Sequence, residues 1–196
     1  MTTNLAASLY LVSGILFILA LRGLSSPETS RRGNLFGILG MALAITVTFL
    51  FVDILFSGLL FIICALAIGG SIGSIIAYRV SMTAMPQLIA GFHSFVGLAA
   101  VLVALSAFYN PEAFELGTLN NIKTASLIEM SIGASIGAIT FTGSVIAFLK
   151  LQGLMSGTPI TFKGQHFINL LIGIGIVSLI IYVTINQSNH IFLALI

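Results

Sequence analysis

The charged residues of this chain fall in short intervals between long apolar stretches, and this pattern sets the tightest limit on its fold. Six stretches are each long enough for a helix to cross the hydrocarbon core of a bilayer, which takes about 20 residues. They are Leu5–Leu21, Leu35–Val52, Ile54–Tyr78, Pro86–Phe108, Thr124–Leu149 and Phe167–Ile185. A last apolar run, Ile191–Ile196, has the character of a seventh. We therefore predict an all-α integral membrane protein, a bundle of six complete transmembrane helices plus the start of a seventh.

The amount of charge excludes a soluble protein. Only 6% of the 196 residues are Asp, Glu, Lys or Arg, whereas soluble domains have about 25%. So few charges cannot cover the surface of a soluble globule. The net charge of +2 gives no basic patch for phosphates, so we expect no nucleic-acid partner. The connections are short, which predicts one transmembrane domain over residues 1–196 and no extramembrane catalytic domain.

The distribution of basic residues predicts the orientation of the bundle. Six of them lie in the first, third and fifth connections: Arg22, Arg31, Arg32, Arg79, Lys150 and Lys163. The other connections contain Lys123, Asp53, Glu112 and Glu115. Because Lys and Arg favour the cytoplasmic side of a membrane, we expect the odd-numbered connections in the cytoplasm and the N-terminus outside. Asp53 is expected in a tight turn at the interface, where water solvates it.

His93 and Glu129 are the ionisable side chains that stand clearly inside predicted spans, where such groups are costly and often functional. His93 lies about seven residues beyond Pro86, or roughly 10 Å into the membrane. Imidazole gains and loses a proton near neutral pH, so His93 is a candidate proton carrier. The alternative is a structural role, in which a neutral imidazole bonds to a backbone carbonyl or to Ser94.

Glu129 begins a stripe of small and hydroxylated residues on one helix face. The other members are Gly133, Gly137, Thr140 and Ser144, and together they occupy an arc of about 80°. Glu129 is therefore a candidate for the outer point at which protons enter. Three hydroxyl side chains are candidates to line the path: Thr140, Ser144 and Ser94. A depth of roughly 12 Å would separate Glu129 from His93. The alternative is that Glu129 reaches the outer interface and the stripe serves helix packing.

Motifs for nucleotide, metal or ester chemistry are missing from the sequence. The glycines of GIGIVS (173–178) faintly resemble a dinucleotide loop, but no strand precedes them and no acidic residue follows at the required spacing. The single cysteine, Cys64, excludes an intrachain disulfide and a cysteine-based metal site. We therefore expect this chain to bind neither a cofactor nor a metal.

Four extended stretches carry a resemblance to a known family. They are GLSSPETSRRGN (23–34), MTAMPQL (82–88), HSFVGLAAVLV (93–103) and GAITFTGSVIAF (137–148). In their sequence, order and spacing they resemble the beta subunit of proton-translocating NAD(P) transhydrogenase. This enzyme, a translocase and oxidoreductase, couples hydride transfer from NADH to NADP⁺ to proton movement into the cytoplasm. It lies in the bacterial plasma membrane or the mitochondrial inner membrane.

The resemblance implies roles for individual residues and partners. It implies that His93 is central to proton translocation and that Glu129 corresponds, with a weaker match, to a glutamate of the family. NAD(H) is bound by the alpha subunit, and NADP(H) by a domain that follows the beta spans. The implied partners are the alpha subunit, the remaining beta spans with the NADP(H) domain, the lipid bilayer and a second copy in a dimer of the complete enzyme.

The C-terminal end of the sequence departs from the family pattern. Further spans and the NADP(H) domain follow in the family, which implies either a fragment of a longer subunit or a subunit split over two chains. Two other hypotheses stand beside the resemblance. One is a stand-alone small proton-coupled transporter or channel, which predicts internal repeats and interrupted spans. The other is a non-functional truncated remnant.

Overall fold

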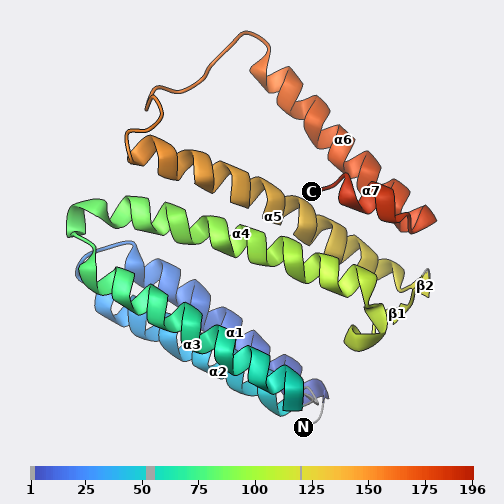
Figure 1. Cartoon of the computed structure of the whole chain (residues 1–196), viewed down its shortest axis with the longest axis horizontal. Coiled ribbons are helices and arrows are strands. Elements are labelled where there is room, and N and C mark those ends of the chain that lie inside the picture. The colour runs from blue at the N-terminus through green and yellow to red at the C-terminus, as the bar shows by residue number, and fades with distance from the viewer. Residues whose placement is uncertain (1–2, 52–55, 120) are drawn as a thin grey trace. The chain divides into compact units, whose positions relative to one another are not determined.

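The computed structural model describes residues 3–51, 56–119 and 121–196 and consists almost entirely of helices (Figure 1). The long helices are α1 (Thr3–Leu24), α2 (Ser30–Phe51), α3 (Phe56–Arg79), α4 (Met85–Tyr109), α5 (Thr124–Leu151) and α6 (Gln165–Asn186). The short elements are η1 (Met82–Ala84), η2 (Pro111–Phe114), β1 (Gly117–Thr118), β2 (Asn121–Ile122) and α7 (Asn189–Leu193). Within these ranges, six helices have the length and hydropathy to cross a membrane. The predicted all-α membrane fold is confirmed.

The second span begins earlier than its hydropathy predicted. α2 starts at Ser30 instead of Leu35, so Arg31 and Arg32 lie in its first turn and not in a loop. Hydropathy marks where a helix enters an apolar phase, whereas the backbone stays helical through the polar residues that precede it. The connection between α1 and α2 therefore shrinks to residues 25–29. The tight turn predicted at Asp53 lies outside the described residues.

The chain divides into two compact units, Met1–Ala77 and Tyr78–Ile196. In the first unit, α1 and α2 form a tight helical hairpin, and the first family-like stretch makes its turn. A Cβ atom added to Gly23 would lie 2.5 Å from the Cα of Gly33, so the two backbones touch there. Deeper in the hairpin, the Ser13 hydroxyl donates a hydrogen bond of 2.7 Å to the Gly40 carbonyl. Small residues thus hold α1 and α2 together, as expected between membrane helices.

In the second unit, α4 and α5 run side by side over their whole length, whereas α6 approaches α5 only toward its own C-terminal end (Figure 1). The core lies at that end. Its buried residues are Ala104, Ala107, Phe108, Ile122, Leu127, Met130, Ala134, Val183, Phe192 and Leu195. The rings of Phe108 and Phe192 stack with centroids 4.1 Å apart. Phe192 belongs to α7, which begins two residues before the predicted run Ile191–Ile196 and ends at Leu193.

The connection between α4 and α5 is more ordered than a polar loop. β1 and β2 form a two-stranded antiparallel hairpin in which Gly117 pairs with Ile122. The amide of Gln187, at the C-terminal end of α6, accepts a hydrogen bond of 3.0 Å from the Ile122 N–H and donates one of 3.3 Å to its carbonyl. The Gln187 side chain therefore connects the C-terminal end of α6 to the β1–β2 hairpin.

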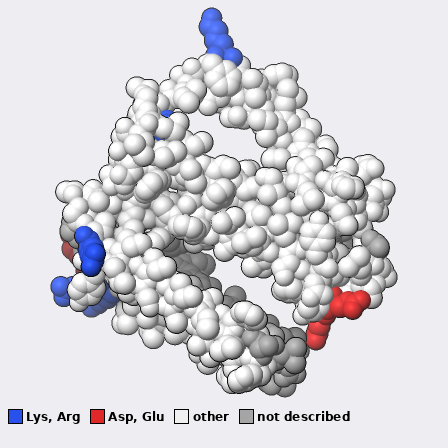
Figure 2. Space-filling view, viewed as in Figure 1, with Lys and Arg blue, Asp and Glu red and all other residues white. Residues whose placement is uncertain are grey.

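Charge is sparse on the surface, as the largely white view in Figure 2 shows. Almost all charged residues of the described ranges lie in end turns or connections: Arg22, Glu28, Arg31, Arg32, Arg79, Glu112, Glu115, Lys123, Lys150 and Lys163. Glu129 is the exception among them, because it lies in the second turn of α5. The long faces of the helices are therefore apolar, as contact with lipid tails requires.

Candidate functional site

The α4–α5 hairpin carries both ionisable residues that the sequence placed inside spans. Two glutamines connect the start of α4 to the end of α5, opposite the connection between the two helices. The Gln87 side-chain amide donates a hydrogen bond of 2.9 Å to the Leu151 carbonyl. Gln152 donates to the Gln87 side-chain oxygen at 3.2 Å. Pro86, at the start of α4, suits a helical first turn, since the ring fixes φ and no N–H is lost from the helix. The second family-like stretch thus joins the start of α4 to the end of α5.

The third and fourth family-like stretches meet where Gly97 of α4 crosses Gly137 of α5. A Cβ atom added to Gly97 would lie 2.5 Å from the Phe141 nitrogen and 2.7 Å from the Gly137 carbonyl oxygen. One added to Gly137 would lie 2.9 Å from the Gly97 carbonyl oxygen. Both residues are buried. The two helix backbones are therefore in direct contact, and this contact sets the register of the hairpin.

That register places His93 level with Ser144. Gly91 lies against the ring of Phe148 and Gly97 against the backbone of Phe141, so the turn of α4 between them faces the turn of α5 that contains Ser144. The imidazole of His93 itself is exposed. The next residue, Ser94, is buried, and its hydroxyl donates a hydrogen bond of 2.7 Å to the Gly91 carbonyl.

The predicted stripe on α5 is divided by the packing. Gly137 is buried against α4, Thr140 and Ser144 are half-buried, and a Cβ atom on Gly133 would meet open space. Glu129 is exposed. At 100° per residue it lies on the side of α5 opposite its buried residues, among them Leu127. The stripe is thus partly a helix contact, at Gly137, and partly an open face, at Glu129.

Glu129 and the level of His93 lie far apart along the hairpin. Glu129 precedes Ser144 by fifteen residues, which places it roughly 23 Å along α5 from the level of His93. The depth of roughly 12 Å expected from the sequence is measured across the membrane and stays a prediction. α4 and α5 contain 25 and 28 residues and are longer than a bilayer core is thick.

The comparison with known proteins assigns the family. The sequence profile of the NAD(P) transhydrogenase beta subunit matches residues 6–196. The chain belongs to this family. Two curated relatives from Rhodospirillum rubrum, one of them from a named strain and both called NAD(P) transhydrogenase subunit beta, are 56% identical to it over 166 residues. The match covers 85% of this chain and 35% of each relative, so the chain spans about a third of their length.

Two buried hydroxyl residues of this transhydrogenase beta chain were not selected from the sequence. Ser131 and Ser135 of α5 are almost fully buried, with exposures of 0% and 4%. Their hydroxyls donate to the carbonyls of Leu127 and Ser131 at 2.7 and 2.9 Å. The spacing in the sequence could have predicted their burial, because Ser131 and Ser135 are four residues apart and share a helix face with the small residue Ala138. Since their protons are bonded within α5, they are suited to close packing.

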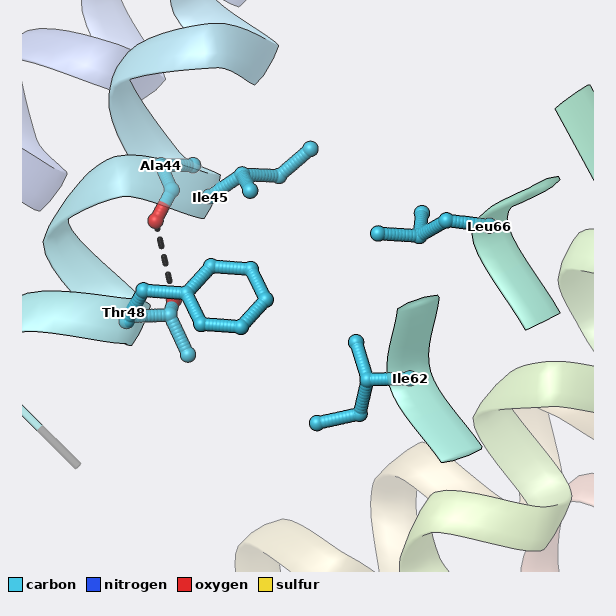
Figure 3. Close-up of a pocket in the computed structure, with 6 residues that line it drawn as sticks. Ala44, Ile45, Thr48, Ile62 and Leu66 are labelled. Carbon is cyan, nitrogen blue, oxygen red and sulfur yellow. Dashed lines mark hydrogen bonds between the residues drawn. The ribbon is translucent and has the colours of Figure 1, made fainter. Parts of the chain in front are cut away.

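Most grooves in the described part of this family member are lined mainly by apolar groups. One groove in the first unit, of about 240 Å³, lies between α2 and α3 (Figure 3). Its lining residues are Ala44, Ile45, Thr48, Phe49, Ile62 and Leu66. The Thr48 hydroxyl in it donates to the Ala44 carbonyl at 2.8 Å. Over the ranges that the structure covers, His, Cys, Asp and Glu side chains form no group of three that could hold a metal.

Proposed function

We propose that this chain carries the proton path of a proton-translocating NAD(P) transhydrogenase and that His93 takes up and releases the proton. One observation carries the proposal. Among the His and acidic residues of the six long helices as described, His93 and Glu129 lie beyond the end turns, and both belong to the α4–α5 hairpin. The imidazole is exposed beside the hairpin contact, where water or other spans could reach it. Imidazole is a side chain that can both gain and lose a proton, as a carrier that is reloaded in every cycle must.

The direction of the path follows from the proposed orientation. We place the chain in the bacterial plasma (inner) membrane with the N-terminus outside, on the support of the basic residues Arg22, Arg79 and Lys150 near the proposed cytoplasmic surface. Protons would enter near Glu129, and Thr140, Ser144 and Ser94 would line the part of the path near His93. The roughly 23 Å between the two levels would be bridged by water or by side chains of other spans.

The hydride transfer that drives this path takes place on other parts of the enzyme. We propose that an alpha subunit binds NAD(H), that a separate beta domain binds NADP(H), and that the complete enzyme is a dimer. The family of the chain and the name of its relatives support these partners. In this arrangement the chain itself binds no nucleotide. Nucleotide binding on the other parts of the enzyme is coupled to this chain by a conformational change, which alters the access of protons to His93.

The test is a His93→Ala variant in the complete enzyme. Alanine removes the titratable ring and adds no bulk, so the helices remain compatible with the fold. We expect proton uptake into inverted membrane vesicles to fall by about two orders of magnitude or more, as for loss of a positioned proton-transfer group. Uptake is measured with a pH-sensitive dye while NADPH and an NAD⁺ analogue react.

His166→Ala is the matched control, because His166 lies in the first turn of α6, at a membrane surface. This control should translocate protons at the normal rate. The amount of assembled enzyme in the membrane is measured for both variants, so that a loss of assembly is not mistaken for a loss of transport. Near-normal proton uptake by assembled His93→Ala enzyme would contradict the proposal.

A further inference from the structure

The connection between α5 and α6, residues 152–164, is unusually apolar for a segment outside the helices. Figure 1 shows it as an extended orange trace. Four large apolar side chains are exposed there: Leu154, Met155, Ile160 and Phe162, with exposures of 73%, 39%, 74% and 51%. Exposed apolar side chains on a spanning helix face lipid tails. On a connection they would face water, which is unfavourable, unless the segment lies against an apolar phase.

The connection is held at the end of the helical hairpin. The Lys150 ammonium donates a hydrogen bond of 3.1 Å to the Thr158 carbonyl, and the Leu154 N–H donates one of 3.0 Å to the Leu149 carbonyl. At the other end, the Gln165 N–H donates to the Phe162 carbonyl at 3.2 Å. Because α5 and α6 are consecutive spans, both ends of the connection lie at the same membrane surface. The segment therefore stays at the level of the lipid headgroups.

The charge of this region has a single sign. Lys150 precedes the connection and Lys163 lies near its end, and the sequence has no acidic residue after Glu129. Lysine side chains attract anionic phospholipids at a membrane surface. Apolar residues next to lysines are also the combination that holds a segment in the plane of the interface.

We propose that the α5–α6 connection is an interfacial segment that binds anionic phospholipids. Ile160 and Phe162 enter the boundary between headgroups and acyl chains, while Lys150 and Lys163 contact the phosphates. The one residue of α6 that the described structure buries is Val183, near the C-terminal end of the helix. The N-terminal half of α6 therefore has no protein contact of this kind, and the lipid contact would hold it in place. The proposal is independent of the proton path and of the enzyme's partners.

The test uses the full 196-residue chain, which contains no tryptophan. Phe162→Trp places a single fluorescent reporter in the connection with little change in shape. The chain is reconstituted in nanodiscs of phosphatidylcholine, with or without phosphatidylglycerol. We expect quenching by lipids brominated near the headgroup and weak quenching by acrylamide in water. The fraction of phosphatidylglycerol around the reporter should be higher than its fraction in the whole nanodisc. Lys163→Gln should lower this enrichment by about fivefold.

Leu119→Trp is the matched control, in the connection between α4 and α5. Leu119 is also an exposed apolar residue, at 56%, but Glu112 and Glu115 precede it. Its fluorescence should not depend on phosphatidylglycerol. Strong acrylamide quenching of the Phe162→Trp reporter would overturn the proposal, since the segment would then face water. Protection from both quenchers would also overturn it, because another protein segment would then cover the site. An unchanged enrichment in Lys163→Gln would overturn the role of the lysine.

Discussion

His93 and Ser94 are neighbours in the sequence but have opposite environments, because successive residues of a helix point about 100° apart. Ser94 is buried and satisfies its hydroxyl within α4, at the Gly91 carbonyl. His93 is exposed beside the α5 contact. The Ser94 hydroxyl thus gives its proton to the backbone of its own helix, while its oxygen can still accept a hydrogen bond.

Glu129→Gln tests whether this carboxylate passes protons to the proposed path. Glutamine keeps the size and polarity of the side chain but cannot carry a proton. If protons enter at Glu129, transport in assembled enzyme should slow by about tenfold or more. The rate is measured as proton uptake, driven by nucleotides, in inverted membrane vesicles.

Glu115→Gln provides the control for this substitution. Glu115 is an exposed carboxylate in the connection that precedes α5, and its loss should leave transport unchanged. An unchanged rate in Glu129→Gln as well would favour the other interpretation, in which the carboxylate only reaches the outer interface.

At the scale of helices, the packing depends on where side chains are smallest. Gly97 and Gly137 bring the backbones of α4 and α5 into contact, and the buried residues of α4 continue along the same face at Val101 and Ala104. Membrane helices gain little from burying apolar surface away from lipid, so close backbone packing takes over that role. The glycines therefore determine the level at which His93 meets α5.

Gly97→Ala should weaken this hairpin. The new methyl group would lie 2.5 Å from the Phe141 nitrogen, so α4 and α5 would have to move apart. We expect a loss of about 1–3 kcal/mol in stability, the usual cost of overpacking, seen as a lower unfolding temperature in detergent. Gly143→Ala is the control, because nothing lies within 4 Å of its added Cβ. Equal unfolding temperatures for the two variants would contradict the role of the glycine contact.

The sequence predicted the helices well but not the contacts that join their ends. A span is a local property, since about 20 apolar residues in a row suffice to define it, and α4 and α6 begin within two residues of the predicted Pro86 and Phe167. The hydrogen bonds between Gln187 and Ile122 join residues 65 apart. Polar contacts of this kind leave no periodic pattern in the sequence. The exposure of His93 and Glu129 also depends on tertiary packing. The sequence could therefore identify these residues as candidates but could not predict which side chains surround them.

At the scale of the molecule, the second unit is held together mainly at one end. Phe108 of α4, Leu127 of α5, Val183 of α6 and Phe192 of α7 meet in one buried cluster. The N-terminal half of α6 has mainly exposed side chains, among them Phe167 at 64%. α6 is therefore attached to the α4–α5 hairpin near its C-terminal end, through this cluster and the Gln187 amide.

Phe192→Ala should release that attachment. Phe192 is completely buried and its ring stacks on Phe108, so truncation leaves a cavity that costs about 3–5 kcal/mol. We expect a lower unfolding temperature and faster proteolysis of the connection between α5 and α6, because α6 and α7 would separate from the hairpin. Phe167→Ala removes the same ring from an exposed position and should change neither measurement. If Phe192→Ala also left both unchanged, the α6 helix would have to be held by contacts other than this cluster.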